Sequence, residues 1–394
     1  MRLSGRLAGY LTLVVLTSAC RGLTGVDDLE FQGAGTATAA SGGGGQGGEG
    51  GALVGSGGGG GSGGGGSGSG SGGSGGSGGG SVEPVVGCTL PVQACPTVLV
   101  GDTKAKVDIL AMDSTHLYWA SRGAQGLGSG SIGRVKKDGG EVVPIIQNVS
   151  PRGLVVDPID SLVFWTNEQK VSGELRAIPS DMSGLQSSLV VVDELPLEAL
   201  TIGTANQLLF YTVPSNGLIY RVSSTTSASG LVNIYNGPSA LQTDLVVDGD
   251  TLFWTEPGQI GRIEDASGAA DSLYWITLPS GDPYRIDVAN GSIYYTLRQG
   301  IGSVKAIDRV TFSITTIAGT QPFPSHILAS EIGLHWATDG DADCLLGNGS
   351  VRRSIDDAVA TLAEGLLCPT NLVEDASYIY WGAGSRIFRA PKSL

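Results

Sequence analysis

The sequence predicts an all-β fold, a single β-propeller of four-stranded blades, with seven blades favoured and six as the alternative. Two observations lead to this prediction. A four-residue aromatic pattern recurs seven times, at steps of 41 to 46 residues, and each copy lies among short β-rich runs separated by turn residues. Repeats of this length are typical of propeller blades. We call the third residue of each pattern the anchor; the anchors are Trp119, Trp165, Tyr211, Trp254, Tyr295, Trp336 and Trp381.

The first residues have the features of an export signal. Arg2 and Arg6 precede the apolar run Leu11–Leu16, and small residues lead to Cys20. This order is typical of a secretory signal peptide, and the run is shorter than the roughly 20 residues of a membrane-spanning helix. The cysteine resembles that of a bacterial lipobox, which implies that it is lipidated. We expect residues 1–19 to be a lipoprotein-type signal peptide and Cys20 to be the lipidation site; an ordinary signal peptide with an incidental cysteine is the alternative.

The segment after Cys20 predicts a place in the cell envelope and a flexible tether. Lipoproteins with Asp in the next position are held at the inner membrane, whereas this chain has Arg21. The resemblance therefore implies export to the cell envelope with an outer-membrane anchor. In residues 41–80, 27 of 40 residues are Gly. Such a stretch cannot bury enough apolar surface to offset its conformational entropy, so we expect residues 20–85 to be a disordered tether.

Residues 86–394 are expected to form the propeller. An apolar strand precedes the anchor strand in a repeat, as in 153–157, and a Gly-led strand such as 130–135 follows it. Leu252 and Trp254 face one side of their strand, while Phe253 faces the other, because side chains alternate along a strand. Both faces are therefore bulky, as a blade between two neighbouring blades requires.

The two ends of the propeller region predict how the ring closes. The last repeat contains an inner strand, the anchor strand and a third strand at 385–390, but the chain ends before a fourth. Residues 96–101 form an apolar run ahead of the first repeat. We expect this N-terminal strand to complete the last blade, which would remove two open sheet edges.

The anchors, the Asp in the preceding turn and the Gly-x-Ile-x-Arg strand resemble the YWTD propellers of lipoprotein-receptor ectodomains and the TolB-like propellers of bacteria. Those families usually have six blades, whereas this sequence has seven anchors. The combination of lipobox, Gly/Ser tether and propeller also resembles secreted lipoproteins of myxobacteria. Because these families bind many different partners, the resemblance implies an architecture and not a particular activity.

Composition and motifs exclude some classes of function. The chain has 23 Lys and Arg against 37 Asp and Glu, and its net charge is −14. Nucleic-acid binding needs clustered Lys and Arg, so we expect no nucleic-acid partner. The propeller region shows no Ser/His/Asp order, no HExxH motif and no nucleophile elbow. We therefore assign no catalytic residue and no cofactor-binding residue.

The cysteines left after Cys20 predict two disulfides, since an even number in an exported chain is typical of disulfide bonding. In the propeller, Cys344 lies in the loop between the second and third strands of the sixth repeat, and Cys368 lies where the sixth repeat passes into the seventh. These connections share one face. We expect Cys344–Cys368 and Cys88–Cys95 bonds.

One acidic loop is a candidate metal site. Asp339, Asp341 and Asp343 alternate along the chain, and Ca²⁺ takes several such oxygen ligands. However, Cys344 stands where an EF-hand loop has Gly, so a solvated acidic loop is the favoured interpretation and Ca²⁺ the alternative.

Three further groups recur or stand out in the repeats. Turn aspartates, interpreted as Asx turns rather than cation ligands, are Asp113, Asp157, Asp248 and Asp375. Third-strand arginines, expected to pair with carboxylates on neighbouring strands, are Arg134, Arg221, Arg262, Arg353 and Arg389. Polar exceptions on the apolar inner strands are Glu198, Asp244, Asp287 and Asn371.

The favoured hypothesis for function is a non-catalytic, lipid-anchored protein of the cell envelope that attaches to the membrane through its lipid and presents its propeller to a protein, glycan or small ligand. The alternative is a metal-dependent hydrolase of the lactonase type, with a divalent cation in the propeller channel. Such a site needs Glu, Asp or Asn side chains that converge from several inner strands, and the four polar exceptions do not share one offset. A scaffold within a larger envelope assembly is a third hypothesis.

Overall fold

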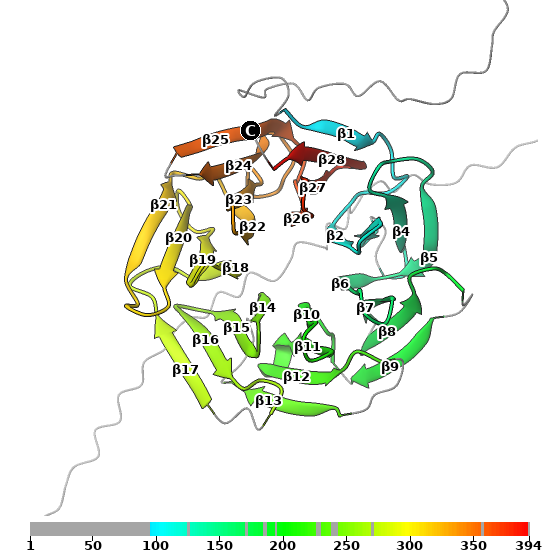
Figure 1. Ribbon diagram of the computed structural model, residues 1–394, viewed down its shortest axis with the longest axis horizontal. Coiled ribbons are helices and arrows are strands. Elements are labelled where there is room, and N and C mark those ends of the chain that lie inside the picture. The colour runs from blue at the N-terminus through cyan, green and yellow to red at the C-terminus, as the bar shows by residue number, and fades with distance from the viewer. Residues whose placement is uncertain are drawn as a thin grey trace, which may run out of the picture. The chain divides into compact units, whose positions relative to one another are not determined.

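The computed structural model describes residues 95–392, except 124–126, 170–171, 184–186, 194, 226–229, 238–242, 269–271 and 356–357. The described residues form seven four-stranded antiparallel sheets that are arranged as blades around a central axis (Figure 1). The predicted seven-bladed, all-β propeller is confirmed. The predicted signal peptide and tether lie outside the described residues. No helix in the described part of the chain is long and apolar enough to cross a membrane.

In blades 1 to 6 the strands follow chain order from the axis to the outer edge. Blade 1 contains β2 (Ile109–Met112), β3 (His116–Ser121), β4 (Gly130–Lys136) and β5 (Val143–Val149). Blade 2 contains β6 (Pro151–Asp157), β7 (Leu162–Glu168), β8 (Gly173–Pro179) and β9 (Ser188–Asp193). Blade 3 contains β10 (Leu200–Gly203), β11 (Leu208–Val213), the 3-10 helix η2 (Pro214–Asn216), β12 (Leu218–Ser223) and β13 (Val232–Asn236).

The remaining blades repeat the same order. Blade 4 contains β14 (Leu245–Asp248), β15 (Thr251–Glu256), β16 (Gln259–Glu264) and β17 (Ser272–Thr277). Blade 5 contains β18 (Pro283–Ala289), β19 (Ser292–Leu297), β20 (Ser303–Asp308) and β21 (Ile314–Gly319). Blade 6 contains β22 (Pro324–Ser330), β23 (Gly333–Thr338), β24 (Gly349–Ile355) and β25 (Ala358–Leu366). Blade 7 contains β26 (Val373–Glu374), β27 (Tyr378–Ala383), β28 (Arg386–Pro391) and β1 (Thr97–Val100).

Blade 7 closes the ring with strands from both ends of the described chain. Strand β1 pairs antiparallel with β28, with Thr97 opposite Arg389 and Val98 opposite Phe388. Figure 1 shows β1 in cyan beside β28 in dark red. Val100 of β1 is buried in a cluster that also contains Leu110 of blade 1. The N-terminal closing strand predicted from the sequence is confirmed.

The anchor strands pack between blades, as the alternation predicted. On β15, Leu252 and Trp254 belong to a buried cluster with Phe210 of blade 3. Phe253, on the other face of β15, belongs to a cluster with Tyr295 of blade 5. All seven anchors are at most 2% exposed. The seven interfaces between blades are therefore the hydrophobic core of the ring.

Glycines on the third strands make room for the anchor rings. Gly133 lies directly opposite Trp119, and Gly261 lies directly opposite Trp254. A Cβ atom at either glycine would overlap the indole of the tryptophan across from it. The ring of the anchor thus lies flat over the neighbouring strand, and this close approach requires glycine there.

Candidate functional site

One end of the propeller channel opens into a cavity to which all seven blades contribute. The connections from each blade to the next reach this end, as do the loops between second and third strands. The cavity has a volume of about 860 Å³. We call it the entrance cavity. Ligand sites of known proteins occupy clefts of about 300 to 1,000 Å³, so its size suits a ligand.

Each blade contributes one residue at the entrance end of its innermost strand or just before that strand, and together these residues form what we call the entrance ring. The entrance ring consists of Ile109, Gly153, Ala199, Asp244, Arg285, His326 and Asn371, all of which line the entrance cavity. Blades 1 to 3 supply small or apolar side chains, whereas blades 4 to 7 supply polar ones. The ring therefore has an apolar half and a polar half, so it is asymmetric although the blades repeat one architecture.

Three polar side chains of the inner strands bind the next blade. Asp244 accepts a hydrogen bond from the Ile286 N–H at 3.0 Å, and Asp287 accepts one from the Ala329 N–H at 2.7 Å. Asn371 of blade 7 forms two hydrogen bonds with the main chain of Leu110 in blade 1, at 2.7 and 2.6 Å. These groups hold successive inner strands together around the channel.

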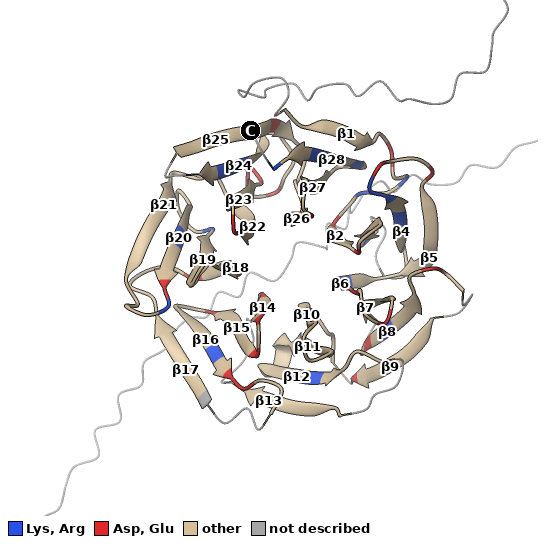
Figure 2. Cartoon of the chain, in the orientation of Figure 1, with Lys and Arg blue, Asp and Glu red and all other residues tan. Residues whose placement is uncertain are grey.

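Five basic side chains reach the entrance cavity of this strongly acidic chain: Lys106, Arg122, Arg152, Arg285 and Arg298. Figure 2 shows acidic and basic residues on the strands around the central opening. Lys106 pairs with Asp108 at 2.9 Å, Arg298 with Asp339 at 2.8 Å, and Arg152 with Glu168. The lining also holds six carboxylates, of which two are paired with these cations and two accept main-chain N–H groups; the six are Asp108, Glu198, Asp244, Asp287, Asp339 and Asp343.

Two of these arginines have N–H groups without a hydrogen-bond partner among the described residues. The exposed guanidinium of Arg122 makes no hydrogen bond or ion pair with any described residue, although its main-chain N–H donates to Asp108. Arg285 donates one Nη to the Thr243 carbonyl at 2.5 Å, but its buried Nε has no hydrogen-bond partner among the described residues. The Nη that binds Thr243 also lies 3.9 Å from the Asp244 carboxylate, and the other Nη has no described hydrogen-bond partner. Arg122 and this second Nη of Arg285 are therefore the unused donors beside the entrance cavity.

Desolvation and neighbouring arginines lower the pKa values of Arg122 and His326 at the entrance cavity. Although Arg122 reaches solvent, the surrounding channel walls desolvate its guanidinium and lower its pKa. The charges of Arg152 and Arg285 lower this pKa further, and those of Asp108 and Glu198 raise it. The pKa of His326 falls well below its ordinary value, first because of burial and then because of nearby arginines. His326 is therefore neutral near pH 7.

A smaller pocket adjoins the entrance cavity. This side pocket has a volume of about 420 Å³ and is lined by Thr243, Pro257, Asp282, Pro283, Tyr284, Arg298, Gln299, Gly300 and Phe323. Thr243, Tyr284 and Arg298 line both spaces, so the side pocket lies directly beside the entrance cavity. The guanidinium of Arg298 lies 5.1 Å from the Tyr284 ring centre and 5.9 Å from that of Phe323. A cation thus stands at the edge of a largely apolar pocket.

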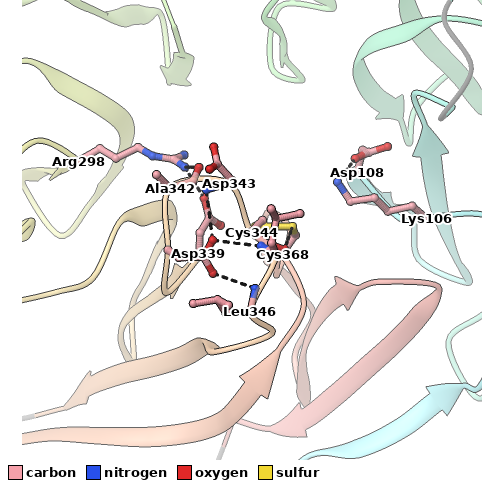
Figure 3. The surroundings of a disulfide bond; sticks show 11 residues. Lys106, Asp108, Arg298, Asp339, Ala342, Asp343, Cys344, Leu346 and Cys368 are labelled. Carbon is pink, nitrogen blue, oxygen red and sulfur yellow. Dashed lines mark hydrogen bonds and ion pairs between the residues drawn. A yellow bond between two sulfur atoms is a disulfide. The ribbon is translucent and has the colours of Figure 1, made fainter. Parts of the chain in front are cut away.

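The disulfide borders the entrance cavity. Cys344 and Cys368 are bonded, with a Cα–Cα distance of 5.3 Å, so this predicted pair is confirmed. Figure 3 shows Arg298 directed toward the loop that carries Cys344, with Lys106 and Asp108 across the opening. Cys95 is disulfide-bonded; its predicted partner Cys88 and the predicted lipidation site Cys20 lie outside the described residues.

The carboxylates of the candidate calcium loop do not converge on one point, because Asp339 and Asp341 bind different groups of the protein. Asp339 pairs with Arg298, while Asp341 accepts the N–H groups of Leu345 at 3.0 Å and Leu346 at 3.2 Å. These main-chain donors lower the pKa of Asp341. Within the described ranges, no group of three or more His, Cys, Asp and Glu is arranged to hold a metal ion. The Asp341 contacts are those of a loop closed by its own carboxylate, and calcium binding by Asp339, Asp341 and Asp343 stays a prediction.

Most of the turn aspartates form Asx turns. The carboxylates of Asp113, Asp157 and Asp375 each accept the main-chain N–H two residues further on, at 2.6, 2.9 and 2.8 Å. Asp248 differs, since it forms an ion pair with Arg309. All four lie at turns between first and second strands, at the other end of the channel.

The expected pairing of the third-strand arginines with carboxylates on neighbouring strands was wrong: among the described residues, Arg262 alone of the five pairs with a carboxylate, and that carboxylate, Glu264 at 2.9 Å, belongs to its own strand. Three others donate to a main-chain carbonyl in the third-to-fourth strand turn of the next blade: Arg134 to Ser180, Arg221 to Ala266, and Arg389 to Lys137. The long side chain spans the gap between blades, where a turn carbonyl is closer than a carboxylate. Arg353 is buried and its Nη atoms have no described partner.

Sequence reasoning missed the entrance ring, although a signal was present. Asp244, Arg285, His326 and Asn371 each precede their anchor by ten residues, so four consecutive blades carry a polar residue at one position. The metal hypothesis requires Asp, Glu or Asn at these positions, and Arg285 and His326 do not belong to that set. His335 stands where other anchor strands have an aromatic residue, and it is fully buried.

Comparisons with known proteins support the fold and no particular activity. No family model and no curated protein matches the chain. Among solved structures, it is similar to the WD40 β-propeller domain of Doa1, with 12% identity over 74% of this chain and 94% of that chain, at a TM-score of 0.58. It is also similar to the GH74 enzyme of Niastella koreensis, with 13% identity over 75% of this chain and 54% of that chain, at a TM-score of 0.57. At such identities the likeness establishes a β-propeller alone.

Proposed function

We propose that this chain is a non-catalytic, lipid-anchored protein of the cell envelope whose propeller binds a protein, glycan or small ligand at the entrance cavity. The observation that carries the proposal is the entrance ring, whose polar half breaks the symmetry of the blades at a cavity that all seven line. Propellers use such channel openings because loops from every blade converge there.

The anchoring part of the proposal depends on the sequence. The basic start, the apolar run Leu11–Leu16 and Cys20 are those of a lipoprotein signal. The disulfide between Cys344 and Cys368 agrees with an oxidising compartment outside the cytoplasm. The tether in residues 20–85 would hold the propeller away from the membrane and leave the entrance cavity accessible.

Two substitutions in one loop test binding at the entrance cavity. Ala342 is exposed and lines the cavity, whereas Leu346 is 76% exposed in the same loop and does not line it. The full chain is immobilised and binding of a detergent extract of the source envelope is measured by interferometry. Ala342→Trp should abolish the saturable signal that the wild type and Leu346→Trp retain. Equal signals from both variants would overturn the proposal.

A further inference from the structure

The free donors at the entrance cavity belong to two arginines: Arg122 has no ion pair with any described residue, and the ion pair of Arg285 with Asp244 is long, at 3.9 Å. Arg122 extends from the loop between β3 and β4, and Arg285 comes from β18, three blades away in the shorter direction around the ring. Neither is fully satisfied by the protein, as described above. A guanidinium held by the fold with unused donors is suited to an oxyanion, because charge-assisted hydrogen bonds to carboxylates are among the strongest available.

The surroundings also limit what the anion can be. The side pocket begins where Arg298 and Tyr284 end the entrance cavity, and Pro257, Pro283 and Phe323 give it an apolar lining. A ligand that reaches both spaces must carry apolar surface beside its charge. An inorganic anion would leave the side pocket unfilled, and a purely apolar ligand would leave the arginine donors unpaired.

We propose that the ligand of the entrance cavity is an organic anion, in which an oxyanion group binds Arg122 and Arg285 and an apolar body enters the side pocket beside Arg298. This inference rests on the proposed function, since it names the class of ligand for the same cavity. The neutral imidazole of His326 supplies a hydrogen-bonding group next to the bound oxyanion without adding charge.

Three probes of one shape and different charge test the ligand class. The probes are 2-naphthoate, 2-naphthamide and 2-naphthylmethylamine, and their binding to the full chain is measured by calorimetry. We expect the dissociation constant of naphthoate to be at least about tenfold lower than that of the amide, as one charge-assisted hydrogen bond provides, and the amine to bind more weakly still. An amide or amine that binds as tightly as naphthoate would overturn the proposal.

Two charge-neutralising variants locate the anion. Arg122→Gln removes an exposed guanidinium without described side-chain partners, so the fold should be kept, and unchanged thermal unfolding would verify this. Lys136→Gln removes an exposed cation at the far end of β4, away from the entrance cavity. Arg122→Gln should weaken naphthoate about tenfold and leave the amide unchanged, and Lys136→Gln should have no effect. Equal naphthoate affinity in both variants would contradict the assignment.

The same experiment separates this inference from the proposed function. If no naphthyl probe binds while the envelope extract still binds in an Ala342-dependent manner, the ligand class is wrong and the binding site stands. If extract binding is also insensitive to Ala342→Trp, the proposed function itself fails.

Discussion

At the residue scale, the anchors determine more than their own positions. Trp119 and Trp254 lie against strands whose facing residue is glycine, because the indole occupies the volume of a side chain there. The sequence made the aromatic pattern visible at once, since Trp is rare and its spacing regular. The matching glycines could not be predicted from the sequence, because glycine is abundant throughout this chain and only the strand register shows which glycines lie opposite an anchor.

This packing predicts a sharp response to one methyl group. Gly261→Ala should destabilise the propeller by about 1 to 3 kcal/mol, as overpacking of a filled core does. Gly319 on β21 is the matched control, because a Cβ there meets nothing within 4 Å. Thermal unfolding of the full chain should show a lower Tm for Gly261→Ala and little change for Gly319→Ala. Equal shifts would mean that the Trp254 ring can move aside.

The carboxyl of Asp287 predicts a pH dependence. Burial raises its pKa to about 7, whereas the unfolded chain titrates near 3.8. The folded state therefore holds a proton more tightly, and stability should decrease as pH rises from about 4 to about 7 and stay level above. Asp287→Asn keeps an acceptor for the Ala329 N–H and removes the titration. The urea midpoint should change less with pH across this range in the variant than in the wild type. Midpoints that change equally with pH in both proteins would contradict the assignment.

At the element scale, the period of the anchors and the missing fourth strand were enough to predict seven blades and their closure. Both follow from covalent order and from the need to pair sheet edges. The entrance ring could not be predicted in the same way. It depends on which residue of the innermost strand pairs with the anchor. Leu245 pairs with Trp254 nine residues later, whereas Leu154 pairs with Trp165 eleven residues later, so the ring position stands at different offsets in different blades.

Ring closure predicts an unequal effect of two similar substitutions. Val100 is 5% exposed at the junction of blades 7 and 1, whereas Val192 on the outermost strand of blade 2 is 60% exposed. Val100→Asp buries a charge and should cost more than about 3 kcal/mol of unfolding free energy, while Val192→Asp should stay within about 0.5 kcal/mol. Denaturant titration measures both. A mild effect of Val100→Asp would show that β1 is dispensable for the ring.

At the scale of the whole molecule, basic and acidic side chains line one end of the channel, and we expect the chain to be anchored to the membrane by a lipid on Cys20. Expressed in a diderm bacterium, the full chain should incorporate labelled palmitate and pellet with membranes. Cys20→Ser should lose the label and become soluble, and Arg21→Lys should behave as the wild type. Membrane association that survives Cys20→Ser would exclude the lipid as the anchor.

The central claim is that the molecule binds its ligand at the entrance cavity. Hydrogen exchange of the full chain, with and without envelope extract, tests it most directly. We predict protection in the entrance segments of several blades, at 106–109, 284–287, 325–328 and 369–372, and none in the turns at the other end, at 113–116 and 375–378. Protection confined to those turns or to the outermost strands would contradict the account.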